Sequence, residues 1–112
     1  MADVGNKQVM TQPEKVKYII DNSCVFFGIE KGDLIINVGS RSKIWFKKRF
    51  IVAALDEFTA CNQEEIAELV GYKERTNVST HLKKFKEELS TELYGYEKTK
   101  RIYNELLSYL NL

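Results

Sequence analysis

Proline and glycine are scarce in this sequence, with one proline and six glycines among 112 residues. A β-sandwich or β-barrel needs many more turn-forming residues, so this scarcity argues against an all-β fold. Long apolar runs are also missing, because no stretch approaches the roughly 20 residues that span a membrane. The segment 1–7 lacks a basic region followed by an apolar one. We therefore expect no signal peptide and no membrane association, and a cytoplasmic location.

Histidine and cysteine are also few. His81 is the one histidine, and with Cys24 and Cys61 it offers too few ligands for a structural zinc site. Both cysteines lie in apolar helical patterns and are predicted to be buried free thiols. No nucleophile, metal or phosphate-loop pattern occurs. The sequence therefore predicts a protein that is not an enzyme and has no metal, cofactor or small-molecule substrate.

The apolar residues that are present, 44% of the chain, recur at helical spacing, and no stretch alternates as a strand would. This pattern predicts an all-α, compact bundle of five to six helices. Asp33 is expected to cap a short helix over 34–36, and residues 94–96 to interrupt the pattern. Longer helices are expected at about 13–27, 44–59, 63–70, 76–89 and 97–110, after a flexible leader of residues 1–12.

Charge is unevenly distributed, although the formal net charge is only +1. Residues 40–50 contain five basic side chains and no acidic one, and residues 71–86 contain five basic side chains and one acidic one. Between them, residues 51–70 contain five acidic side chains and no basic one. Two separate basic segments are typical of a nucleic-acid contact surface. Solvated helix faces of alternating charge give the same pattern, so charge alone does not decide.

The segment 63–85 combines a short helix, a tight turn and a second helix with a polar, basic outer side. Ala67 is small where two helices of a helix-turn-helix cross, and Gly71 suits the left-handed backbone of the turn. In such a motif the second helix enters the DNA major groove with its N-terminus first. A helical hairpin with a solvated basic face is the alternative.

The side chains at the start of this second helix suit base reading. Arginine can donate twice to guanine, glutamate can accept from cytosine, and a threonine methyl can pack on thymine. Further along the helix, outward-facing lysines would meet phosphates. The residues in question are Lys73, Glu74, Arg75, Thr76 and Asn77 at the start, followed by Thr80, Lys83 and Lys84.

Residues 14–89 resemble the C-terminal DNA-binding domain of the bacterial replication initiator DnaA, a member of the Trp-repressor-like helix-turn-helix group. Residues 66–78 align without a gap with the family pattern I-G-x-x-F-G-G-R-D-H-[ST]-T-V. Residues 40–49 align with its basic loop S-[KR]-x-[KR] and helix arginine, and residues 27–34 with its F-G-x-x-x-x-D-L turn. The family's D-H-[ST]-T is Glu74-Arg75-Thr76-Asn77 here, which predicts a target other than the usual initiator box.

The resemblance implies a domain over residues 13–93 that binds double-stranded DNA sequence-specifically, with residues 94–112 as an extra helix packed on it. A nucleoid-associated monomer or weak homodimer is expected, without ATPase activity, in replication initiation or transcription control of a chromosome, phage or mobile element. Glu74, Arg75 and Thr76 would contact bases, and Arg41 the minor groove. Phosphate contacts are expected from Lys43, Arg49, Lys73, Asn77, Thr80, Lys83 and Lys84.

Two phenylalanines of the 44–59 helix are the least obviously buried. Phe46 and Phe50 lie one turn apart and are candidates for a partner surface or for the docking site of residues 97–110. The alternative function is a helical protein–protein interaction adaptor that keeps the fold but does not bind DNA. It predicts an exposed apolar patch that Phe46 and Phe50 form together with Tyr103 and Leu107.

Overall fold

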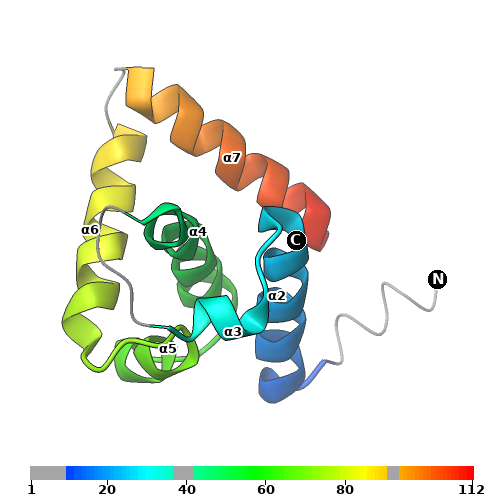
Figure 1. Cartoon of the computed structure of the whole chain (residues 1–112). Coiled ribbons are helices and arrows are strands. Elements are labelled where there is room, and N and C mark those ends of the chain that lie inside the picture. The colour runs from blue at the N-terminus through cyan, green and yellow to red at the C-terminus, as the bar shows by residue number, and fades with distance from the viewer. Residues whose placement is uncertain (1–9, 37–41, 91–93) are drawn as a thin grey trace.

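The protein is described here from a computed structural model, which covers residues 10–36, 42–90 and 94–112. All regular structure in these residues is helical, and the radius of gyration of 13.8 Å is close to the roughly 13 Å expected for a folded domain of this size. The predicted all-α bundle of five to six helices is thereby confirmed. In chain order the helices are α2 (Gln12–Phe27), α3 (Lys31–Leu34), α4 (Lys43–Phe58), α5 (Gln63–Leu69), α6 (Arg75–Ser90) and α7 (Tyr94–Leu110) (Figure 1).

Helix α4 is the centre of the bundle, and the other helices surround it (Figure 1). Each of α2, α3, α5, α6 and α7 contacts it. Every residue from Lys48 to Leu55 is buried, so this part of α4 is covered on all its faces. An amphipathic helix leaves one face exposed to solvent, whereas α4 has no solvent-exposed face along these two turns.

The helix ends follow local capping chemistry. The Thr11 side chain and Glu14 form a capping box at the start of α2, and Asn62 and Glu65 form another at the start of α5. Gly28 ends α2 in the left-handed conformation, with φ of 67°. These features place the ends of α2 and α5 within one residue of the predicted positions.

Two helix starts differ from the predictions. The short helix begins at Lys31 after the cap residue Glu30, and the Asp33 carboxylate accepts the Glu30 backbone N–H at 3.3 Å from inside the first turn. Asp33 thus closes a capping box instead of preceding the helix. Helix α7 begins at Tyr94, so residues 94–96 form its first turn and do not interrupt the pattern.

Helix α7 crosses from the end of α6 to α2 and closes the bundle (Figure 1). Leu106 and Leu110 are fully buried. The Tyr103 hydroxyl donates to Glu57 Oε1 at 2.6 Å, and the Tyr18 hydroxyl donates to the Leu110 carbonyl at 3.0 Å. The two hydrogen bonds join α7 to α4 and α2. None of the helices in the described residues is long and apolar enough to cross a membrane.

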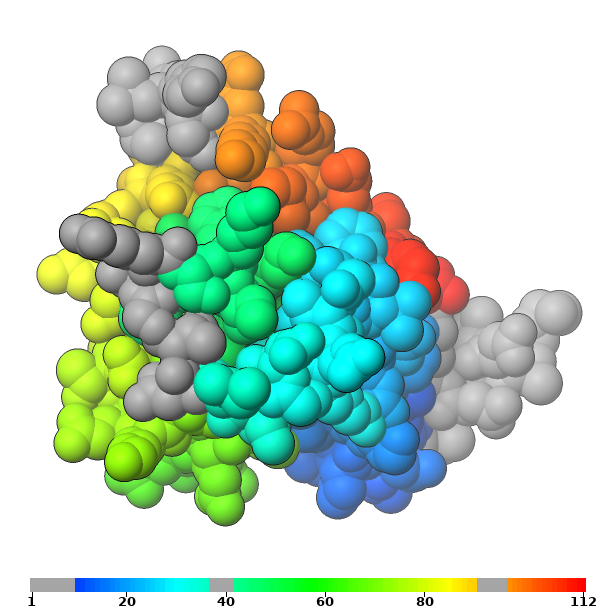
Figure 2. Space-filling view, in the orientation of Figure 1, coloured from blue at the N-terminus to red at the C-terminus, as the bar shows by residue number. Residues whose placement is uncertain are grey.

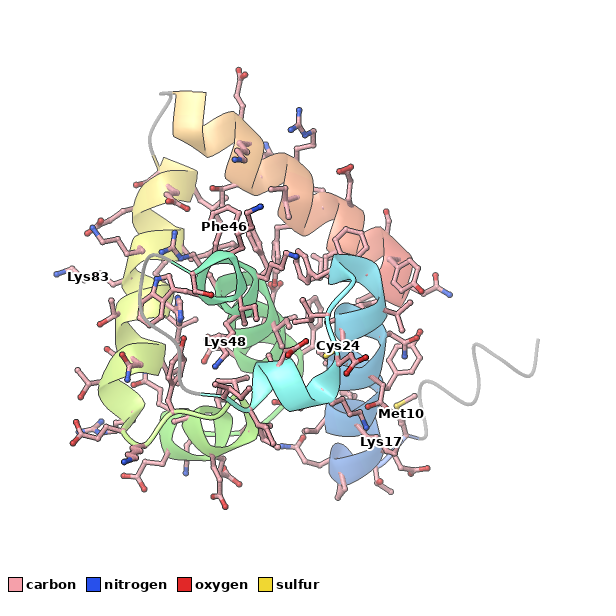
Figure 3. All side chains as sticks on the ribbon, in the orientation of Figure 1. Met10, Lys17, Cys24, Phe46, Lys48 and Lys83 are labelled. Carbon is pink, nitrogen blue, oxygen red and sulfur yellow. The ribbon has the colours of Figure 1, made fainter. Side chains whose placement is uncertain are left out.

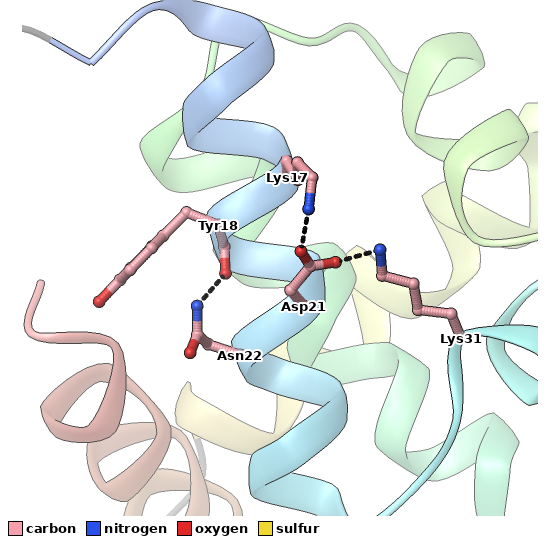
Figure 4. A network of polar contacts seen from close by, with 5 residues as sticks. All are labelled: Lys17, Tyr18, Asp21, Asn22 and Lys31. Carbon is pink, nitrogen blue, oxygen red and sulfur yellow. Dashed lines mark hydrogen bonds and ion pairs between the residues drawn. The ribbon is translucent and has the colours of Figure 1, made fainter.

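A surface ion network joins α3 to α2 (Figure 4). The Asp21 carboxylate accepts from Lys17 at 2.6 Å and from Lys31 at 2.5 Å. These two hydrogen bonds lower the pKa of Asp21. Because the lysines are mostly exposed, the network adds little stability, and its effect is to orient the short helix.

Candidate nucleic-acid interface

The turn between α5 and α6 is closed by backbone hydrogen bonds. The Tyr72 N–H donates to the Ala67 carbonyl at 2.8 Å, and the Gly71 N–H donates to the Glu68 carbonyl at 3.3 Å, which is the Schellman arrangement. Gly71 has φ of 80°, and a Cβ there would lie 2.0 Å from the Ile35 carbonyl oxygen. Glycine is therefore required at this position for two reasons, the left-handed backbone conformation and the close approach to the end of α3.

Tyr72 anchors the turn to the core. Its hydroxyl lies 2.8 Å from His81 Nε2, and the Trp45 ring centroid lies 4.3 Å from that of His81. Burial, reinforced by the nearby cations Arg49 and Lys48, lowers the pKa of His81 to about 4. The imidazole is therefore neutral near pH 7, and it is a structural group that connects α6, α4 and the turn.

The first residues of α6 and those before it face solvent. Lys73, Glu74, Arg75 and Thr76 are exposed, and Asn77 is half-buried. Within the part of the chain that the structure describes, neither Lys73 nor Arg75 has an ion-pair partner. The side chains predicted to read bases are therefore accessible.

The outer face of α6 continues this polar surface. Thr80, Lys83 and Lys84 are exposed, whereas Val78 and Phe85 on the opposite face are buried. The Lys83 side chain extends away from the bundle (Figure 3). Helix α6 lies along one edge of the molecule and α2 along the other (Figure 2). The inward and outward faces of α6 are thus the predicted ones.

The basic segment 40–50 does not continue this surface as a whole. Arg41, predicted to reach the minor groove, lies outside the described residues, and Lys43 is exposed. Lys47 donates to the Phe27 carbonyl at 3.1 Å. Lys48 and Arg49 are buried. The prediction that both basic segments face DNA is therefore wrong for the second half of this one.

Arg49, for which the resemblance implied a phosphate contact, points into the protein. Its Nη1 lies 3.0 Å from Glu88 Oε2 on α6, and its side chain is 11% exposed. The second Glu88 oxygen accepts from the Thr99 hydroxyl at 2.8 Å. Arg49 thus joins α4 to α6 and, through Glu88, to α7, and it is not one of the exposed cations.

The spacing of Lys48 and Arg49 relative to the apolar residues of α4 indicates that both face the core. Lys48 follows Ile44 by four residues and precedes Ile51 by three, so it lies on the stripe predicted to face the core. Arg49 likewise follows Trp45 by four residues. Counting charges along the sequence ignores this periodicity, and Lys48 was missed as a functional candidate for that reason.

The phenylalanine pair serves the core. Phe50 is fully buried between the Phe46 and Phe85 rings, whose centroids lie 5.1 and 6.1 Å away. Phe46 is partly buried, and Lys98 Nζ of α7 lies 5.4 Å from its ring centroid. Of the two roles predicted for the pair, docking of residues 97–110 agrees with these contacts. The exposed apolar patch of the adaptor hypothesis is wrong, because Phe50 and Tyr103 are buried.

Acidic side chains border the proposed interface. A pocket of about 520 Å³ lies between the outer side of α5 and the start of α6, and its lining includes Glu64, Glu68, Glu74 and Arg75. Glu64 and Glu68 are exposed, one helical turn apart. The surface is therefore positive along α6 and negative along α5, and its charge is not of one sign.

Other features of the chain concern its metal and thiol chemistry. Among the described residues, no group of three His, Cys, Asp or Glu side chains could hold a metal ion. Both cysteines are free thiols, Cys24 buried as predicted and Cys61 only partly buried.

The fold and site define a six-helix domain, within the described residues, whose α5–α6 pair presents a polar helix start. No protein-family model matches the chain, and neither the curated proteins nor the solved structures contain a match.

Proposed function

We propose that this chain is a non-enzymatic module that binds double-stranded DNA sequence-specifically, with α6 in the major groove. The proposal includes a helix-turn-helix of the Trp-repressor-like group, similar to the DNA-binding domain of DnaA, acting in replication or transcription control. The observation that supports it best is the accessible start of α6, where Lys73 and Arg75 are exposed and unpaired within the described residues. A helix N-terminus also favours phosphate through its unpaired N–H groups.

The exposed side chains have distinct roles in this proposal. Arg75 donates to guanine, Glu74 accepts from cytosine, and Thr76 contacts a thymine methyl. Side chains that surround them or lie further along α6 contact phosphate and set the register on the duplex. The phosphate set is Lys43, Lys73, Asn77, Thr80, Lys83 and Lys84; Arg49 is omitted because it is buried. The minor-groove role of Arg41 stays a prediction.

Helix α5 opposes binding in one respect. The first helix of a helix-turn-helix crosses the phosphate backbone. Here that helix carries Glu64 and Glu68 on its exposed side, and their charge repels phosphate. We infer that sequence-independent binding is weak and that base contacts supply much of the affinity.

Fluorescence anisotropy over a salt series tests the proposal, with a duplex that has been selected for binding from random sequences. Each phosphate contact that is removed should flatten the slope of log K against log salt by about 0.9. We expect this for Lys83→Met and not for Lys17→Met, which removes the same charge from α2. No binding at micromolar protein and low salt contradicts the proposal, and salt-insensitive self-association without duplex affinity favours the adaptor function.

Base reading needs a separate experiment. Selection of binding sites from random duplexes should yield one preferred sequence for the natural chain. Arg75→Met should cost about 1–3 kcal/mol of binding free energy and relax the preference at one base pair. Equal losses on all sequences would instead assign Arg75 to phosphate.

A further inference from the structure

We propose that Lys48 is a positioning residue, which fixes the α5–α6 turn against the end of α3 and so sets the orientation of α6. The effect of this orientation on DNA binding rests on the proposed function. Lys48 is fully buried at the centre of the molecule (Figure 3). Its Nζ donates to the Ile36 carbonyl and to the Val70 carbonyl, each at 2.7 Å.

The two acceptors lie next to a close approach of two backbone segments. A Cβ on Gly71 would meet the Ile35 backbone at 2.0 Å, so these residues leave no space for a side chain between them. Ile36 and Val70 are their immediate chain neighbours. The Lys48 ammonium therefore holds both segments next to the Gly71–Ile35 contact. Lys48 belongs to α4, which contacts all the other helices.

The third side of the ammonium faces an aromatic ring. Lys48 Nζ lies 4.4 Å from the ring centroid of Tyr72, the residue that follows Gly71 in the turn. Among the residues that the structure describes, the titratable and charged groups around it include Tyr72 and His81, which are neutral near pH 7, and Arg49, which is positive. Among the described residues no carboxylate pairs with Lys48, and burial lowers its pKa to about 8.

A buried cation without a carboxylate is costly to desolvate, and an apolar side chain of similar size removes that cost. The geometric effect is different, because the Val70 carbonyl at the end of α5 would lose its Lys48 donor. Removing the ammonium should therefore loosen the turn much more than it destabilises the whole fold. A residue that acts in this way changes affinity without touching DNA.

The test compares Lys48→Met with Lys43→Met, which removes an exposed cation from the same helix. In Lys48→Met we expect amide hydrogen exchange to accelerate about tenfold at Gly71 and Tyr72, with little change at Ile19 in the core. Duplex affinity should fall about tenfold with an unchanged salt slope, because no phosphate contact is lost. In Lys43→Met the slope should flatten and turn exchange should stay the same.

Unchanged exchange at the turn in Lys48→Met overturns the proposal, and so does a flattened salt slope. If the natural chain binds no duplex, the proposed function fails, but the exchange experiment still decides whether Lys48 holds the turn. If Lys48→Met does not fold, NMR of the natural chain decides. An exchange-protected Lys48 ammonium signal that titrates well below the other lysines supports the proposal, and a freely exchanging one overturns it.

Discussion

The Tyr72 hydroxyl lies 2.8 Å from His81 Nε2, and both side chains are buried. Tyr72 belongs to the turn and His81 to the inner face of α6, so this hydrogen bond joins the turn to the helix that it precedes. Within the described part of the chain, His81 Nδ1 has no hydrogen-bond partner. The charged ring carries a proton on each nitrogen, so its Nδ1–H would have no acceptor among these residues, and the charges of Lys48 and Arg49 disfavour the charged form further.

We predict that acid destabilises the fold through His81. The unfolded side chain binds a proton below its ordinary pKa of 6.5, and the folded one only below about 4. Between these values the unfolded state holds more protons, so stability falls as the pH falls through this range. The loss is at most about 3 kcal/mol.

Urea unfolding across this pH range measures the effect. The matched control is the double variant Tyr72→Phe/His81→Phe, which removes both partners and leaves every carboxylate in place. The difference between the two pH profiles isolates the histidine. Parallel profiles would contradict the prediction.

We predict that substitution by alanine lowers the free energy of unfolding more at Gly71 than at Gly28. Both have positive φ, 80° and 67°, so alanine is strained at either position, by about 1–2 kcal/mol. A Cβ at Gly28 meets no described residue within 4 Å, whereas at Gly71 it meets the Ile35 backbone. We expect Gly71→Ala to cost clearly more than Gly28→Ala in urea unfolding. Equal costs would show that the approach to Ile35 relaxes easily.

Arg49 and Glu88 should be coupled energetically and have no direct role in DNA contact. Arg49→Met leaves the half-buried Glu88 without its cation, and we expect a loss of about 1–3 kcal/mol in unfolding free energy. A double-mutant cycle with Glu88→Gln should give a favourable coupling energy. The salt slope of duplex binding should stay unchanged, and a slope flattened as in Lys83→Met would instead place Arg49 on phosphate.

Neutralising the acidic side of α5 should strengthen duplex binding. Glu64→Gln/Glu68→Gln removes two exposed negative charges beside the start of α6, and we expect affinity to rise by about 2- to 10-fold at low salt. Glu65 is left in place because it caps α5. Glu97→Gln/Glu105→Gln on α7 makes the same change in net charge, and an equal gain there would indicate a general charge effect.

Local features of the fold could be predicted from the sequence because their causes are local. Thr11, Gly28 and Asn62 terminate or start helices through side-chain and backbone chemistry within a few residues, and the structure places those ends as expected. The outward positions on α6 followed from the spacing of Val78 and Phe85. The start of α7 was missed because residues 94–96 carry no clear apolar pattern.

The interior of α4 could not be predicted from charge alone. Whether a basic residue faces solvent depends on what packs around its helix, and five helices cover α4. Lys48 is buried because carbonyl oxygens of residues 12 and 22 positions away meet its ammonium. Arg49 is buried because Glu88 approaches from 39 positions away. Long-range partners of this kind leave no trace in the composition of residues 40–50.

The position of Lys48 on the enclosed helix α4 also limits how the α5–α6 pair could be transplanted. A graft of residues 62–90 onto another scaffold would carry the caps and the outward side chains but leave behind the ammonium that reaches the Val70 carbonyl. The recipient would need its own buried donor at that point. Portability of this pair therefore depends on a residue that belongs to neither of its helices.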